Sequence, residues 1–400
     1  MAELLELAEA QARLIALAPE MRVVSGPVEP GATRYLAHDL VAMRTSPEAD
    51  LSAMDGYAIA GEGPWRLVGE ARAGVPFAGS LAPGECTRLS TGAHLPAGAT
   101  GVLIRENALL EDERVALAPG APSPAPMQHV RRRGGDFAKR DVLLPAGTAI
   151  GPAQLALALA AGHDALAHRA GPALALLESG DELAAQPSDA RPGRIPATNG
   201  AMLERMVAPY AGSLHRPPPV ADDRGALAEA LAACEEADVI VTSGGASVGE
   251  HDLVQAALIE WGAQIAFWKV AVKPGKPLMV ATREGARGQR QVVLGLPGNP
   301  VSSFVTGFLF ALPLLRACLG AAAPFERPVQ LKAGEDLPGA GDRREFLRAV
   351  SDGAVVRLAG AQESSALRSL ALANALIERP AGAPPVKRGE RIAVYNLRNG

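Results

Sequence analysis

Loops rich in Gly, Ser and Pro carry the residues of this sequence that could do chemistry. Residues 243–249 (SGGASVG) follow a short apolar run and lead to Asp252 at the expected start of a helix. Backbone amides without bulky side chains can approach an anionic oxygen there, so the loop favours phosphate binding. A tight Gly turn with Ser and Asp as helix caps would show the same residues, and this alternative stays open.

Two Pro-containing loops point to the same chemistry. In residues 295–303 (GLPGNPVSS), Asn299 can cap a helix and Pro300 suits its first turn, so a stiff loop would present helix-start amides. Rigid capping alone would explain much of this pattern. In residues 273–277 (KPGKP), two lysines share a constrained turn, as a substrate with several phosphates would require. Two surface lysines would look the same.

Acidic residues stand where the phosphate-type loops are expected to gather. Residues 178–182 (ESGDE) follow another apolar run. Carboxylates beside an anion site imply a bridging cation, and their hard oxygens favour Mg²⁺. Taken singly, each acid could equally be a helix cap or a solvated charge.

The N-terminal half holds a second group of candidates. Asp55 lies in a small-residue turn (SAMDGYA), Thr91 begins TGAHLP, and Arg131 and Asp136 lie in RRRGGD. They would add a hydroxyl, a cationic cluster and two acids to an anion site. Taken singly, Asp55 could be an ordinary turn aspartate, and the arginine run could be a solvated face. The seven histidines show no metal-ligand spacing.

Strands and helices must position these loops. From about residue 152, apolar runs alternate with helical patterns, which predicts βαβ units and a mostly parallel sheet. The predicted strands are 173–177, 238–242, 278–281 and 291–295, and the predicted helices lie near 199–211, 224–235, 251–261 and 300–318. Ligand sites of such sheets lie off the carboxyl ends of the strands, so the loops should meet at one edge.

Segments of β structure flank this α/β region. Residues 22–150 are dense in Gly and Pro around short apolar runs, which is typical of irregular β structure, and a helix is expected at 152–161. After residue 324, strands are predicted at 329–332, 346–350, 354–358 and 391–394.

Composition excludes several classes of protein. The 400 residues have ordinary globular usage and a net charge of -4, which argues against disorder and against nucleic-acid or membrane partners. The 3 cysteines lie far apart, so neither disulfides nor a local zinc site is expected and a cytoplasmic location fits. The N-terminus has no basic region before its apolar residues and is expected to be an ordinary helix. Residues 304–315 are too short to span a membrane and contain Pro313.

The motifs together resemble the MoeA family of molybdopterin molybdenumtransferases. They are SAMDGYA, TGAHLPAGA, RRRGGDF, SGDEL, SGGASVGEHD, KPGKP, GLPGNPVSS and SSALRSLALAN, in family order over nearly the whole chain. The combination is far more specific than a single Gly-rich loop. The resemblance implies a homodimer of four-domain subunits with a molybdopterin-binding α/β domain. The implied domains are 1–45 with about 140–170, 46–139, 171–323, and a barrel-like 324–400.

The resemblance also implies a reaction and its residues. Molybdate would enter adenylylated molybdopterin, with release of AMP and molybdenum cofactor. The implied catalytic residues are Asp55, Thr91, Arg131, Asp136, Glu182 and Asp252, the last two near Mg²⁺ and the first four from the other subunit. The implied substrate-binding residues are Asp222, Ser243, Gly244, Gly245, Ser247, Gly249, Lys273, Lys276, Pro297, Gly298, Asn299, Pro300, Ser302 and Arg343. Arg348 also matches a C-terminal arginine of the family. A molybdopterin adenylyltransferase and molybdoenzymes or their chaperones are the implied partners.

The sequence departs from the family's usual motifs at four positions, Leu51, Gly135, Ser179 and Ala197, each of which removes or shortens a polar side chain. A divergent paralogue that binds the pterin without turning it over therefore stays an alternative. A scaffold protein and an adenylyltransferase are the other two. The separate N-terminal half argues against the adenylyltransferase, and the retained acids argue against the scaffold.

Overall fold

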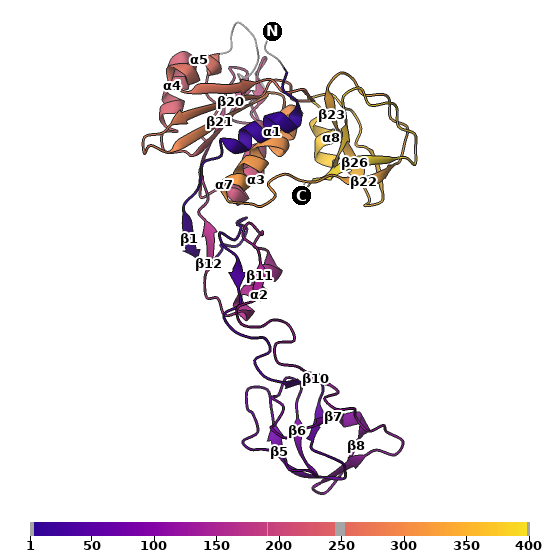
Figure 1. Cartoon of the computed structure of the whole chain (residues 1–400). Coiled ribbons are helices and arrows are strands. Elements are labelled where there is room, and N and C mark those ends of the chain that lie inside the picture. The colour runs from indigo at the N-terminus through magenta and orange to yellow at the C-terminus, as the bar shows by residue number, and fades with distance from the viewer. Residues whose placement is uncertain (1–3, 190, 245–252, 398–400) are drawn as a thin grey trace. The chain divides into compact units, whose positions relative to one another are not determined.

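The computed structural model describes residues 4–189, 191–244 and 253–397. The chain forms two compact units (Figure 1). Unit 1 comprises Met1–His38, Ala146–Ile150 and Leu166–Gly400, and unit 2 comprises Asp39–Pro145 and Gly151–Ala165. The division into four domains stays a prediction.

A six-stranded sheet lies at the centre of unit 1. Its order is β16 (Ser213–His215), β13 (Ala173–Glu178), β17 (Val239–Ser243), β21 (Arg290–Leu296), β20 (Met279–Glu284) and β18 (Gln264–Trp268). The first four strands are parallel, while β20 pairs antiparallel with β21 and β18. The predicted mostly parallel sheet is confirmed. One correction concerns the strands predicted at 278–281 and 291–295, which form a hairpin because a short turn joins them.

Helices cover both faces of this sheet. α1 (Leu7–Ala16), α3 (Asn199–Val207) and α7 (Leu312–Cys318) pack on one face, and α4 (Arg224–Ala232) and α5 (Leu253–Glu260) on the other (Figure 1). In β13, Leu174 and Leu176 belong to the first core, whereas Ala175 and Leu177 belong to the second. A strand buried on both faces is apolar at every position, and this is the pattern that predicted the sheet.

One long apolar helix runs through residues 300–318. It consists of α6 (Pro300–Thr306), a π-helical segment (Gly307–Ala311) and α7. The helix predicted near 300–318 is confirmed and continues through Pro313, because the wider π turn before it accommodates a residue that has no amide hydrogen. The apolar run at 304–315, expected to be too short to span a membrane, is thus part of a longer apolar helix. By length and hydropathy the helix could cross a membrane, but 89% of the searched window is buried, as in a core helix.

The C-terminal strands of unit 1 form a barrel-like sheet, as predicted. β23 (Arg344–Ser351), β24 (Val355–Leu358), β22 (Val329–Ala333), β26 (Arg391–Asn396) and β25 (Ala375–Arg379) follow one another, and β25 pairs back onto β23. The short strand β19 (Val272–Lys273) joins the start of β23. The sequence predicted neither β25 nor the helix α8 (Leu367–Leu372).

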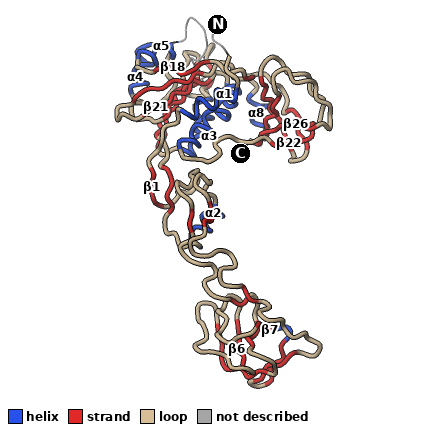
Figure 2. Tube along the Cα trace, viewed as in Figure 1, coloured by secondary structure: helices blue, strands red, loops and turns tan. Residues whose placement is uncertain are grey.

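Unit 2 is built on a second six-stranded sheet. Its order is β7 (Gly101–Ile104), β4 (Gly56–Ile59), β6 (Glu85–Leu89), β5 (Trp65–Ala71), β9 (Arg114–Leu117) and β8 (Ala108–Glu111). Short strands alternate with long loops here, which confirms the predicted irregular β structure (Figure 2). The unit also contains β2 (Leu40–Val41) with β11 (Val142–Leu144), β3 (Leu51–Ser52) with β10 (Val130–Arg131), a 3-10 turn (Arg105–Asn107) and α2 (Pro152–Ala160).

The remaining short elements belong to unit 1. They are the pairs β1 (Val23–Gly26) with β12 (Leu166–Arg169) and β14 (Leu183–Ala184) with β15 (Ile195–Pro196), and a 3-10 turn at Ala208–Tyr210. The β14–β15 pair follows the acidic 178–182 segment and returns the chain to the start of α3.

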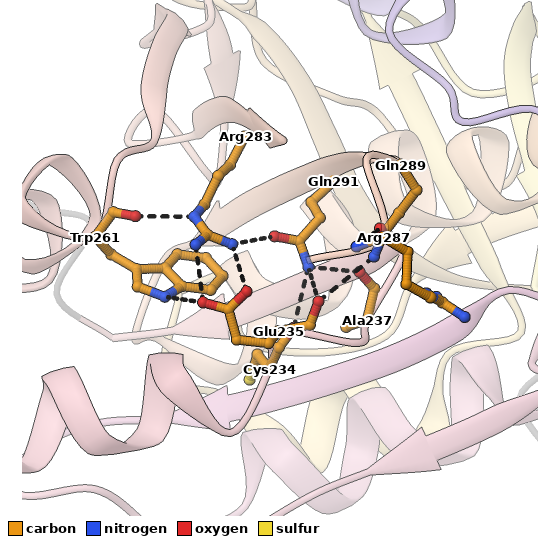
Figure 3. Close-up of polar contacts among 8 residues, drawn as sticks. All are labelled: Cys234, Glu235, Ala237, Trp261, Arg283, Arg287, Gln289 and Gln291. Atoms are coloured by element: carbon orange, nitrogen blue, oxygen red, sulfur yellow. Dashed lines mark hydrogen bonds and ion pairs between the residues drawn. The ribbon is translucent and has the colours of Figure 1, made fainter. Parts of the chain in front are cut away.

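A polar network braces the edge of the unit 1 sheet where β21 begins (Figure 3). Arg283 donates to both carboxylate oxygens of Glu235 and to Gln291 Oε1. It also donates to the carbonyl of Trp261, whose ring lies 3.9 Å from the guanidinium carbon. Since Glu235 follows α4 and Trp261 follows α5, the network ties both helices to the β20–β21 hairpin. It lies at the opposite edge of the sheet from the carboxyl ends of the parallel strands.

Candidate functional site

The carboxyl ends of β13, β17 and β21 bring three of the predicted loops to one edge. The amide of Ser179 donates to the carbonyl of Ser243 at 3.0 Å, so the acidic loop runs directly beside the first Gly-rich loop. Ser243 Oγ contacts the carbonyl of Pro297 at 3.4 Å, which adds the third loop. The structure therefore confirms that these loops meet where the sheet topology required.

Asn199, at the start of α3, ties two of these loops together. Its side-chain amide donates to Ser243 Oγ at 2.9 Å and to the carbonyl of Gly298 at 2.6 Å. The residue is only 4% exposed, and its Oδ1 has no hydrogen-bond partner among the described residues. Sequence reasoning missed Asn199, because a Thr-Asn step before a helix is an ordinary capping signal. No local signal in the sequence points to Asn199, because its partners Ser243 and Gly298 lie 44 and 99 positions away.

The first acid of the 178–182 segment, Glu178, caps the start of α3 and is not free to bind a ligand. Glu178 accepts hydrogen bonds from the amides of Asn199 and Gly200 at 3.0 and 2.9 Å. A carboxylate at this position satisfies free amides and complements the positive end of the helix. Glu178 therefore fixes the start of α3, and with it Asn199.

The remaining acids of this edge lie close together. Asp181 accepts from the amide of Asp222 at 3.0 Å, and Glu182 is exposed, with its carboxylate beside Gly180. Partial burial raises the pKa of Asp222, and the charges of Asp181 and Glu182 raise it further, while a backbone hydrogen bond with Asp181 opposes the shift. Three carboxylates thus crowd one end of the site.

These carboxylates fit a shared cation better than a closed metal site. Within residues 4–189, 191–244 and 253–397, no group of three His, Cys, Asp or Glu side chains could hold a metal ion alone. Mg²⁺ is usually held by one or two carboxylates together with substrate phosphates, so Glu182 suits it as a hard oxygen ligand. The predicted second ligand, Asp252, lies outside the described residues.

Gly244 shows why the first loop needs glycine. Its φ is +100°, and a Cβ there would lie 2.3 Å from the carbonyl oxygen of Ser179. Only glycine tolerates both the left-handed backbone and this close approach. The loop residues Gly245, Ser247 and Gly249 lie outside the described residues.

The 297–302 segment opens α6 as predicted, with one correction. Pro300 occupies the first turn and Asn299 is the N-cap residue, but the Asn299 side chain makes no capping hydrogen bond. The amide of Val301 is not free for an anion, because it donates to the carbonyl of Ser364 at 3.3 Å. Ser302 is buried in the helix. The C-terminal part of unit 1 thus covers the start of α6.

The predicted lysine turn packs against the same helix. A Cβ on Gly275 would lie 2.4 Å from Thr306 Cγ2, so the backbone of the turn touches α6. Lys273 and Lys276 are both exposed. The ammonium of Lys273 donates to Glu345 Oε1 at 2.9 Å, and Arg343 donates to the carbonyl of residue 272 at 3.3 Å. The C-terminal sheet therefore delivers Arg343 beside the lysine turn.

In unit 2, Asp55 and Thr91 meet directly. Asp55 Oδ1 accepts from the amide and the hydroxyl of Thr91 at 2.6 and 2.9 Å. These two hydrogen bonds, with a smaller contribution from the charge of Arg105, lower the pKa of Asp55. A cavity of about 190 Å³ lies beside the pair and is also lined by Glu70 and Arg88. Asp55 is therefore held as an ionised carboxylate facing solvent.

The other two candidates of unit 2 occupy nearby turns. Arg131 lies in β10, opposite Leu51 of β3. The amide of Asp136 donates to the carbonyl of Ser46 at 3.1 Å. In the part of unit 2 that the structure describes, no hydrogen bond or ion pair joins Asp136 to Asp55. The structure thus brings together Asp55 and Thr91, but not all four residues.

The chemistry available at these sites is charge neutralisation and positioning. Lysines, an arginine, glycine-rich backbone and carboxylates suit a polyphosphate substrate with a cation. Thiol chemistry does not fit, since burial raises the pKa of Cys86 and Cys318 to about 12 and that of Cys234 to about 11.

Comparison with known families covers nearly the whole chain. Residues 5–162 match the model of the MoeA N-terminal region (domain I and II). Residues 175–317 match the model described as "Probable molybdopterin binding domain". Residues 330–397 match the model of the MoeA C-terminal region (domain IV).

Relatives of similar length support the same assignment. A molybdopterin molybdenumtransferase of Nostoc sp. is 32% identical over 381 residues, covering 91% of this chain and 86% of the relative. Molybdopterin molybdenumtransferase 2 of Mycobacterium tuberculosis is 30% identical over 397 residues, covering 94% and 95%. The crystal structure of a molybdopterin biosynthesis moeA protein from Pyrococcus horikoshii OT3 superposes with a TM-score of 0.81 at 26% identity, covering 98% and 99%. The chain thus belongs to the MoeA family of molybdopterin molybdenumtransferases, enzymes of molybdenum cofactor biosynthesis.

Proposed function

We propose that the chain inserts molybdate into adenylylated molybdopterin in a Mg²⁺-dependent reaction that cleaves the pyrophosphate bond and releases AMP and molybdenum cofactor. The observation that carries this proposal is the meeting of three phosphate-type loops at one sheet edge, where Asn199 ties Ser243 to Gly298. Membership of the family supports the substrate class.

In this proposal the residues of unit 1 bind and orient the substrate. The glycine loop that begins at Ser243, the Pro297–Pro300 turn, Lys273, Lys276 and Arg343 hold its phosphates, and Asp222 and Ser302 shape the same edge. Exposed lysines neutralise phosphate charge, while the stiff turns fix its position before reaction. Glu182, with Asp252, would hold Mg²⁺, which when bound neutralises charge on the reacting phosphates.

The residues of unit 2 form the second part of the proposal. Asp55 stays ionised through its hydrogen bonds to Thr91 and offers a fixed negative charge. Arg131 and Asp136 supply the neighbouring charges that the family resemblance implies. The origin of these four residues in the other subunit stays a prediction. Mixing the Asp55→Ala and Glu182→Ala proteins under conditions that exchange subunits tests this prediction. If each site combines residues of both subunits, the mixed dimer has one intact site and regains activity.

We further propose a cytoplasmic homodimer that receives its substrate from a molybdopterin adenylyltransferase and passes the cofactor to molybdoenzymes or their chaperones. Its buried cysteines and net charge of -4 support this setting. Light scattering should give twice the mass of 41.2 kDa.

The decisive experiment follows AMP release together with reconstitution of a cofactor-free molybdoenzyme. Purified protein is supplied with adenylylated molybdopterin and Mg²⁺, with and without molybdate. Molybdate-dependent AMP release with reconstitution would establish the reaction. Tight binding without release would favour the non-catalytic pterin-binding paralogue. In a parallel reaction with molybdopterin and ATP in place of the adduct, formation of the adenylylated adduct would favour the adenylyltransferase. Absence of binding in both reactions would favour the scaffold.

Two variants assign the site in this assay. Asp55→Ala and Glu182→Ala should fold and keep their oligomeric state but lose cofactor formation, because each removes an exposed charge and no core volume. Glu284→Ala, which removes an exposed acid at the end of β20, is the matched control and should keep full activity. Normal activity of both site variants would overturn the assignment.

A further inference from the structure

Arg348, in the middle of β23, is among the most completely buried large side chains of the described residues. It is 1% exposed and makes no ion pair with a described carboxylate. Burial lowers its pKa. Burying a charge without an ion pair costs free energy, so the carbonyl oxygens around it must compensate.

The guanidinium of Arg348 organises the loop that follows β24. One terminal nitrogen donates to the carbonyls of Ala361 and Glu363 at 3.1 and 3.0 Å. The side chain of Gln362 pairs with the backbone of Arg348 in both directions, at 2.9 and 3.0 Å. Arg348 of β23 thus fixes the carbonyls of Ala361 and Glu363 and the Gln362 side chain between them.

This loop leads directly to the proposed substrate edge. The next residue, Ser364, accepts the hydrogen bond from the amide of Val301 at the start of α6. Asn299 and Pro300 immediately precede that amide. The same strand β23 also carries Glu345, the partner of Lys273. Arg348 is therefore connected to the edge through a short series of hydrogen bonds, without being exposed to substrate.

We propose that Arg348 is a positioning residue: it holds the 361–364 loop in the conformation that seals the start of α6 and keeps the 297–300 turn ready for phosphate. Its kinetic consequence rests on the proposed function above. Its structural consequence, protection of the Val301 amide, does not. Loss of the guanidinium frees the loop, so the substrate must order it on binding, which raises KM more than it lowers kcat.

The test uses the full-length protein and four variants. Arg348→Met removes the donor, and Arg348→Lys keeps the charge without the planar fork. Gln362→Ala loosens the same loop from a partly exposed position and replaces Arg348→Met if that variant does not fold. Arg357→Met, an exposed arginine of the neighbouring β24, is the control. Amide hydrogen exchange is measured on peptides covering 299–303, and AMP release is measured against substrate concentration.

In Arg348→Met, we expect the amide hydrogens of residues 299–303 to exchange at least about tenfold faster than in wild type. We also expect KM to rise about tenfold, with kcat within about threefold of the wild-type value. The exchange rate and KM of Arg348→Lys should lie between those of Arg348→Met and wild type. Arg357→Met should match wild type in both. A folded Arg348→Met variant with wild-type exchange at 299–303, or one with lower melting temperature but unchanged KM, would overturn the proposal. If wild type releases no AMP, the proposed function fails, and the exchange measurement alone decides the role of Arg348.

Discussion

Glu345 accepts a hydrogen bond from the ammonium of Lys273 at 2.9 Å, across the pairing of β19 with β23. The carboxylate side is nearly buried, with 12% of the Glu345 side chain exposed, whereas 57% of Lys273 is exposed. One face of the ammonium is thus held by the C-terminal sheet and the rest remains open to an anionic ligand.

Lys273→Met should separate binding from stability. We expect KM for the adenylylated pterin to rise about tenfold, and the free energy of unfolding to fall by about 1 kcal/mol because Glu345 loses its partner. Adding Glu345→Gln should restore the stability, since no unpaired charge remains, but not KM. Urea unfolding and steady-state kinetics on the two single variants and the double variant provide the check. Recovery of KM in the double variant would show that Lys273 does not bind substrate.

The Thr91 hydroxyl should set the acid limb of the pH profile. Hydrogen bonds from Thr91 lower the pKa of Asp55, so the carboxylate stays ionised to lower pH than an ordinary aspartate. Thr91→Ala removes one of the two donors, so the pKa rises and the acid limb of kcat/KM moves to higher pH. Thr91→Ser should leave the limb in place. Coincident profiles of all three proteins would count against a role for ionised Asp55.

Gly244→Ala should damage both folding and binding. The φ of +100° and the approach to the Ser179 carbonyl together predict a loss of about 3 kcal/mol in unfolding free energy. Gly193→Ala is the matched control, because its φ is +82° but its Cβ would meet nothing within 4 Å. That variant should lose only about 1 kcal/mol and keep its KM. Equal losses would mean that the contact with Ser179 is unimportant.

Asp222→Asn should stabilise the protein at neutral pH while reducing its activity. The pKa of Asp222 is raised on folding, so its charged form opposes folding at neutral pH, and this penalty disappears as pH falls through the raised pKa. We expect Tm to rise by about 1 °C at pH 7, the size usual for an exposed charge, with no gain below about pH 4. Calorimetry at both pH values checks this. A lower Tm at pH 7 would contradict the unfavourable charge assigned to Asp222.

Arg283→Met should destabilise unit 1 without touching the substrate. It leaves Glu235 without its ion pair and removes the stacking on Trp261, so we expect a loss of about 3 kcal/mol. KM should stay unchanged, because the network lies at the opposite edge of the sheet. Arg290→Met, which removes an exposed arginine at the start of β21, is the control and should change neither the free energy of unfolding nor KM. A raised KM in Arg283→Met would reveal coupling between the two edges.

The central sheet could be predicted because its strands are buried on both faces. Leu174, Ala175, Leu176 and Leu177 form an unbroken apolar run, which a half-buried strand would not show. β18, by contrast, has exposed residues at positions 264 and 266 and was missed. The helix predicted near 300–318 was found despite Pro313, but its π turn could not be predicted, because that turn depends on the packing of the whole helix.

The loops of the site could be predicted, but not the contacts that hold them. Sheet topology alone places Ser243 and Gly298 at one edge. The link through Asn199 and the pair Lys273–Glu345 join residues 44 or more positions apart in sequence. Such long-range pairs leave no local signal in a single sequence.

The packing of α1 has a consequence for how the protein is made. Gln11 donates to the carbonyl of Leu309, 298 residues later, and Leu7 and Leu14 share a core with α7. All of unit 2 lies between these two partners in the chain. At about 5–20 residues per second, translation leaves the apolar face of α1 uncovered for about 15–60 s. Unit 2 can complete its fold on the ribosome during that interval. The face of α1 that packs on α7, by contrast, is covered only after α7 has been made.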